Sequence, residues 1–165
     1  DRAEASGYAY HIENNTLPNT PAHAVLLHFA YGDQHVSMWA AESMAWAIGA
    51  RLRVPALEPG RHPDAYAYVG LEPVPAGEFL GSVISIWDNG PVGGGADNGG
   101  SAPPPITNTP PFEPDFGEDP HSRPRKDPVA QEQKHFFLMP DGMGRFVDTC
   151  DPSLPCTVDG YVPGG

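Results

Sequence analysis

Apolar residues recur with a helical period in one clear stretch of the chain, over about residues 35–53. Only three residues of this stretch are charged, and Pro55 follows, where a helix has to end because proline lacks a backbone N–H. One stripe of the 3.6-residue repeat consists of Met38, Ala41, Ala45, Ile48 and Leu52. The pattern predicts one well-formed helix. It is entered from Asp33, whose carboxylate can accept hydrogen bonds from free backbone N–H groups.

Shorter apolar runs, each bounded by Gly, Pro, Asn or Asp, predict strands rather than further helices. These runs lie near residues 23–31, 65–71, 79–87, 134–139 and 144–148, with a last short one near 157–162. Tight turns such as Asp88-Asn89-Gly90 and Pro140-Asp141-Gly142 favour hairpin connections. We therefore expect an α+β, mainly β, fold in which a small antiparallel sheet or sandwich carries the helix on one face.

Glycine and proline divide the chain into parts. The 165 residues include 19 Gly and 21 Pro, and they concentrate over 90–129, where neither a helix nor a sheet ladder is expected. The prediction is an extended N-terminal arm over 1–22, the first part of one compact domain over 23–89, and a Pro/Gly-rich arm or linker over 90–129. A C-terminal hairpin and cysteine loop over 130–165 complete the same domain.

The charge of the chain excludes some classes of partner. Its 21 acidic and 9 basic residues give a formal net charge of −12. Phosphate backbones and anionic lipid surfaces attract clustered Lys and Arg, so we expect no nucleic-acid partner. No run of about 18 apolar residues occurs, so we expect no membrane insertion.

The two cysteines, Cys150 and Cys156, enclose five residues, two of them prolines. This spacing suits a disulfide at the neck of a small loop, and two free thiols are the alternative. A disulfide indicates an oxidising location, so we expect an extracellular, secreted or virion-associated protein. The sequence starts at Asp1 rather than Met, as expected of a processed chain or of a trimmed sequence.

Motif searches give no catalytic residue, cofactor or metal ligand. The chain has no Gly-x-Ser-x-Gly elbow, and Gly93-Gly94-Gly95 lacks the Gly-Lys-Ser/Thr that completes a phosphate loop. The closest histidines, His23, His28 and His35, are spaced by 5 and 7 residues, which puts no pair on one face of a helix or strand. The sequence leaves open a carboxylate pair among Glu42, Glu72, Glu78 and Asp88.

Aromatic residues in the predicted arms are candidates for binding a partner. Rings separated by prolines can anchor in the pockets of a neighbour with little loss of entropy. The rings in question are Tyr8, Tyr10, Phe112 and Phe116. The alternative is that they fold back onto their own domain.

Three hypotheses of function follow, and no motif identifies a family. The leading hypothesis is a non-catalytic structural or accessory component of a larger assembly, a virion coat or an extracellular complex, whose arms tie neighbouring subunits together. The alternative is a secreted enzyme of hydrolase type, or a ligand-binding module, with a cleft beside the 35–53 helix. The second alternative is a secreted metal-binding protein. Converging His and carboxylate groups in a pocket would favour the enzyme.

Overall fold

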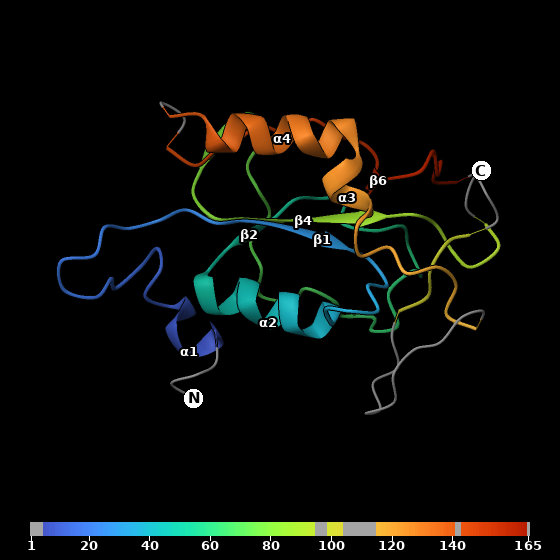
Figure 1. The fold of residues 1–165 in the computed structure, drawn as a ribbon, viewed down its shortest axis with the longest axis horizontal. Helices are drawn as coiled ribbons and strands as arrows, with labels where there is room; N and C mark the ends of the chain where they lie inside the picture. Colours follow the sequence, from blue (N-terminus) through green and yellow to red (C-terminus); the bar gives the residue numbers. More distant parts are fainter. Residues whose placement is uncertain (1–4, 95–98, 104–114, 141–142, 165) are drawn as a thin grey trace.

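The computed structural model describes residues 5–94, 99–103, 115–140 and 143–164, and its elements form three layers. A parallel sheet lies between a layer with α1 and α2 and a layer with α3 and α4 (Figure 1). The strands of this sheet are β1 (Leu26–Ala30), β2 (Arg51–Leu52), β4 (Val83–Asp88) and β6 (Cys156–Thr157). The helices are α1 (Ala5–Ala9), α2 (Met38–Ile48), α3 (Arg123–Lys126) and α4 (Pro128–Leu138).

Strand β4 is the centre of the sheet, and the other three strands pair with it in parallel. Strand β1 runs along one side, with Leu26 opposite Val83 and Ala30 opposite Trp87. Because β1 occupies that side, β2 and β6 share the other. Every residue of β4 is buried, as expected of a strand covered on both faces.

The side chains of β4 alternate between two cores. Ile84 and Ile86 pack with residues of α2, while Val83 packs with Phe137 of α4. Trp87 packs with Ala130 of α4 and with Cys156. Alternation along one strand therefore anchors both helical layers to the sheet.

The mixed helix-and-strand class is confirmed, but the predicted antiparallel pairing of the main sheet is wrong. Within the described residues, antiparallel pairing between named strands is limited to β3 (Phe79–Leu80) with β5 (Arg145–Phe146). Helices contribute more residues than strands, and the strands form no closed barrel in the described part of the chain. Strand sequences do not encode direction, and here long crossovers through α2 and α4 make the strands parallel.

Several predicted elements have other bounds or another type. Residues 134–138 of the predicted 134–139 strand belong to α4, because Asp127 accepts hydrogen bonds from Val129 N and Ala130 N and starts a helix at Pro128. Residues 65–70 form turns instead of a strand. The predicted 79–87 strand divides into β3 and β4, and the predicted 35–53 helix is α2 followed by β2.

Glycine explains why the predicted 35–53 helix ends early. Gly49 has a φ of 79°, and its N–H bonds the carbonyls of Ala45 and Trp46. This left-handed closure turns the chain into β2. The N-terminal segment predicted as extended contains α1, whose Ala9 is fully buried, and α1 contacts α2.

Parts of the 90–129 segment pack onto the domain. Ser101 bridges to Gly117, the Ser101 N–H donates to Gly90 O, and α3 lies within the same segment. Residues 95–98 and 104–114 lie outside the described residues.

Candidate functional site

Polar residues gather where the parallel strands end. The carboxyl ends of β1 and β4 lie at the same edge of the sheet, which is where open parallel sheets place their ligands. Asp33 follows β1 shortly after its last residue, and Asp88 and Asn89 close β4. All three side chains are buried. The topology therefore brings acidic groups from distant parts of the chain to one edge.

Asp88 is neutralised by Arg61. The Arg61 guanidinium donates Nη2–H to Asp88 Oδ1 at 2.6 Å and Nε–H to Oδ2 at 2.8 Å. It also donates to the carbonyls of Gly90 and Ser101, and it lies over the ring of Tyr31 at 4.6 Å. Because Arg61 donates these hydrogen bonds within the protein, its role is structural, and it holds the loops at the end of β4 in place.

The second group at this edge consists of two Asp-x-His segments, Asp33-Gln34-His35 and Asp119-Pro120-His121. We call these four Asp and His side chains the crossed cluster, because each aspartate bonds the histidine of the other segment. His121 Nδ1 lies 2.9 Å from Asp33 Oδ2, and His35 Nδ1 lies 2.6 Å from Asp119 Oδ2. A carboxylate only accepts, so Nδ1 of each ring carries the proton. Both rings thus have a fixed orientation.

Backbone N–H groups hold the two aspartates of the crossed cluster. Asp33 Oδ1 accepts from His35 N and Val36 N, both at 2.8 Å. Asp119 Oδ1 accepts from Gln34 N and His121 N, both at 3.1 Å. Burial opposes ionisation of Asp119, but these N–H donors and His35 outweigh it and hold the pKa of Asp119 below its ordinary value.

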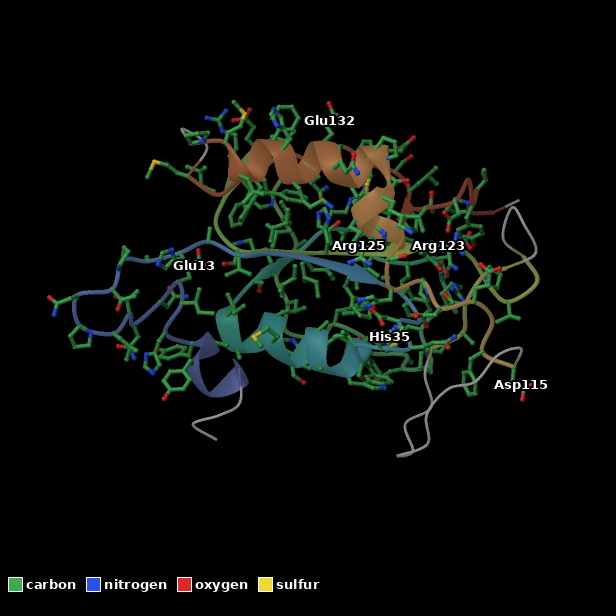
Figure 2. All side chains as sticks on the ribbon, viewed as in Figure 1. Glu13, His35, Asp115, Arg123, Arg125 and Glu132 are labelled. Carbon is green, nitrogen blue, oxygen red and sulfur yellow. A yellow bond between two sulfur atoms is a disulfide. The ribbon has the colours of Figure 1, made fainter. Side chains whose placement is uncertain are left out.

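A cleft of about 530 Å³ opens beside the crossed cluster. Its floor is β1, and one wall consists of Val36 and of Ala40, Ala41 and Met44 in α2. The other wall includes Pro124, Arg125 and Lys134. Asp33 and His121 also line it, at the carboxyl end of β1. Figure 2 shows His35 near the start of α2, on the same side of the molecule as Arg123 and Arg125. The volume and the mostly apolar lining are typical of small-molecule sites.

His28 lies in the floor of this cleft. Its Nε2 is 2.7 Å from Gln133 Oε1, and its ring lies 5.3 Å from the ring of Trp87. Burial lowers the pKa of His28 to about 4, despite the hydrogen bond with Gln133, and Lys134 lowers it further. His28 is therefore neutral at pH 7, which keeps the cleft floor uncharged.

A second His–carboxylate pair lies away from solvent. His62 Nε2 is 3.2 Å from Glu42 Oε1, and both side chains are less than 10% exposed. Burial raises the pKa of Glu42 against the opposing effect of His62. The rings of Tyr31, Trp39 and Tyr68 surround His62. This pair connects α2 to the loop after Arg61.

The sequence left open a carboxylate pair among Glu42, Glu72, Glu78 and Asp88. In the structure Glu42 and Asp88 each bond a basic side chain rather than another carboxylate.

Of the residues predicted from the sequence, the cysteines have the predicted role. Cys150 and Cys156 form a disulfide, and Cys156 begins β6. The loop they close wraps around Arg53, whose guanidinium donates to Asp148 Oδ2 and to the carbonyls of Asp151 and Leu154. The loop is thereby fastened to the sheet.

The predicted partner-binding aromatics that the structure describes lie in different parts of the molecule. Tyr8 and Tyr10 are 45% and 56% exposed at and just after α1, and Phe116 is half-buried near the carboxyl edge of the sheet. Phe112 lies outside the described residues.

Sequence reasoning missed the crossed cluster because it compared only neighbouring histidines. Asp33 and His121 are 88 positions apart, and the topology alone brings them together. The available signal was the repeated Asp-x-His, in which the aspartate can bond its own turn and still present an oxygen to another element.

Comparison of the chain with protein-family models, with curated proteins and with solved structures finds no match. In the described part of the chain, no helix has the length and apolar character needed to cross a membrane. The functional argument therefore rests on the geometry of the site.

Proposed function

We propose that the protein is an enzyme of hydrolase type that cleaves an ester or amide seated in the cleft beside α2. The observation that carries the proposal is the position of Asp33 and His121, which line the cleft where β1 ends. A carboxylate that orients an imidazole is the arrangement by which proteins prepare a group to take a proton from water. Hydrolysis needs no further co-reactant than water.

The crossed cluster supports this chemistry because it leaves one nitrogen of the His121 ring available to a ligand. Nδ1 of His121 is committed to Asp33, and in the described part of the chain its Nε2 has no hydrogen-bond partner. The His121 side chain is 37% exposed, whereas Asp33 is 6% exposed. The buried acid fixes the ring and the exposed part of the ring meets solvent and ligand. Water attacks the carbonyl carbon, and the cluster takes up one of its protons. The cluster then passes this proton to the leaving group as the bond between the carbonyl carbon and that group breaks.

The lining of the cleft indicates the class of substrate. Ala40 and Ala41 leave room along α2, and Met44 adds a flexible apolar contact. On the opposite wall Arg125 and Lys134 supply positive charge in a chain with a net charge of −12. We infer a substrate with an apolar acyl or alkyl body and an acidic or polar end.

The experiment compares the hydrolysis of p-nitrophenyl esters with acyl chains of two, four and eight carbons, and of the matching anilides. We expect turnover above the buffer rate, fastest with a longer chain. His121→Gln should reduce kcat/KM by about 100-fold or more. Ala40→Trp should raise KM by filling the cleft. His23→Gln is the matched control, because His23 is exposed and is not part of the cleft lining.

Two results would overturn this proposal. One is the absence of turnover with every ester and anilide by the wild-type protein. The other is equal activity of the His121→Gln and His23→Gln variants. Circular dichroism of both variants separates loss of activity from loss of fold.

A role in an assembly is a second proposal, and the exposed rings of Tyr8 and Tyr10 favour it. It predicts that the purified chain self-associates or binds a partner, and that Tyr8→Ser with Tyr10→Ser weakens this association in sedimentation. A strictly monomeric chain without a partner would contradict it. The disulfide is compatible with the extracellular or virion-associated location that both proposals share.

A further inference from the structure

We propose that Asp33, His35 and His121 bind a divalent transition metal of the zinc class, with Asp119 as a positioning residue. The three residues offer ligand atoms that all lie within 4.8 Å of one another. The inference deepens the proposed function and rests on it in one respect, since the metal would activate the water that the hydrolase needs. Metal binding itself is testable without any substrate.

The donor set determines the class of metal. Two imidazole nitrogens and one carboxylate oxygen form a set that zinc enzymes use, with a further position left for water. Mg²⁺ and Ca²⁺ prefer sites made of oxygen alone, and Cu(I) prefers sulfur. Zn²⁺ and its spectroscopic substitute Co²⁺ therefore fit these residues best.

The hydrogen bonds of the cluster place the ligands before any metal binds. A metal held by Asp33 and His121 would replace the Nδ1 proton that these two residues share, and it would take over the activation of water from the His121 ring. Asp119 holds the His35 ring through Nδ1, and two backbone N–H groups hold Asp119 in turn. Metal-binding histidines in proteins are commonly oriented by a carboxylate in this way. Gln34 adds a bond from its Nε2 to Gly117 O at 3.0 Å, which joins the first Asp-x-His segment to the chain just before the second.

The exposure of the three ligands fits a metal that enters from solvent and faces the cleft. The side chains of His35 and His121 are 69% and 37% exposed, while Asp33 is 6% exposed at the base. Asp33 and His121 both line the cleft, so an open metal position would point toward a bound substrate. A metal lowers the pKa of bound water toward neutrality, which supplies the nucleophile.

Another group of metal-type side chains in the described residues fails the same test. Asp148, Cys150 and Cys156 are close together, but both sulfurs belong to the disulfide and offer no thiolate. The crossed cluster contains no such obstacle, and its two imidazoles come from different segments.

The test uses the full chain, freed of metal by a chelator and dialysed. Titration with Co²⁺ is followed by visible absorption, and titration with Zn²⁺ by calorimetry. We expect one ion per chain. Asp33→Asn and His35→Gln should each remove or strongly weaken binding, and Asp119→Asn should weaken it by about 10–100-fold. His23→Gln should bind like the wild type.

His35→Gln is the decisive variant, because a side chain that is 69% exposed can be replaced without loss of the fold. The inference is overturned if the wild type binds neither ion at millimolar concentration, or if His35→Gln and His121→Gln bind as the wild type does. If metal-free protein hydrolyses the esters and added Zn²⁺ does not change the rate, the proposed metal site is wrong and the proposed hydrolase activity stands. If the protein binds one ion but hydrolyses no substrate, the metal site stands and the hydrolase activity is wrong.

Discussion

At the residue scale, Arg61 neutralises Asp88, whose side chain is 1% exposed. Replacement by methionine would leave that carboxylate buried without a partner. We expect Arg61→Met to lower the free energy of unfolding by about 3–5 kcal/mol, measured by urea unfolding.

Arg145→Met is the control for the loss of an ion pair as such. Arg145 and Glu78 are 3.6 Å apart with side chains 40% and 65% exposed, so the loss should stay below about 1 kcal/mol. Adding Asp88→Asn to Arg61→Met should recover part of the lost stability, because a neutral amide costs less to bury. Equal losses for the two arginine variants would contradict this account of Arg61.

The candidate site could be predicted from the sequence only in part. The sequence predicts that Asp33 caps the 35–53 helix, but α2 begins at Met38 after Ser37, and Asp33 accepts instead from His35 N and Val36 N in the turn before the helix. Its second oxygen bonds His121, and no local pattern contains that contact. Asp33 and His121 are 88 positions apart, and the crossover connections of the sheet bring them together. The spacing of residues along the sequence does not predict these connections.

At the element scale, the segment after β4 is pinned to the sheet edge by glycine. Gly100 has a φ of +59°, and a Cβ there would lie 1.9 Å from Pro91 O and 2.5 Å from Pro91 C. Neither backbone atom can move aside as a flexible side chain can. We expect Gly100→Ala to lower the free energy of unfolding by at least about 2 kcal/mol more than Gly60→Ala.

Gly60 is a matched control because its φ is +83° and a Cβ there meets nothing within 4 Å. Its substitution measures only the cost of the left-handed backbone, about 1 kcal/mol. Urea unfolding of the two variants gives the difference directly. Equal losses in the two variants would mean that a Cβ at position 100 does not clash with the Pro91 backbone, and would contradict this prediction.

Local signals predicted some elements well and others poorly. The helical stripe predicts the position of α2, and the apolar run of β4 predicts a strand. Its continuous burial is a mark of a parallel central strand, which the hairpin-like turns obscured. The apolar run at the end of α4 has the pattern of a strand, although Asp127 and Pro128 supply a helix start. Periodicity alone does not separate a short apolar strand from the end of a helix.

At the scale of the whole molecule, His28 joins two layers. It lies on β1, bonds Gln133 of α4 and packs against Trp87, so its charge state affects how α4 sits on the sheet. Burial lowers its pKa from 6.5 to about 4. The unfolded chain therefore binds a proton at His28 at a higher pH than the folded chain does.

This difference fixes the sign of a pH dependence. Between pH 6.5 and about 4 the unfolded state carries more protons at His28, so stability falls as the pH falls through this window. We expect the wild type to lose about 3 kcal/mol relative to His28→Gln between pH 7.5 and 4. Urea unfolding of both proteins at four pH values measures the difference. The comparison isolates His28, because the two proteins differ at no other titratable group. Parallel stability curves would show that His28 is not buried as a neutral ring between the sheet and α4.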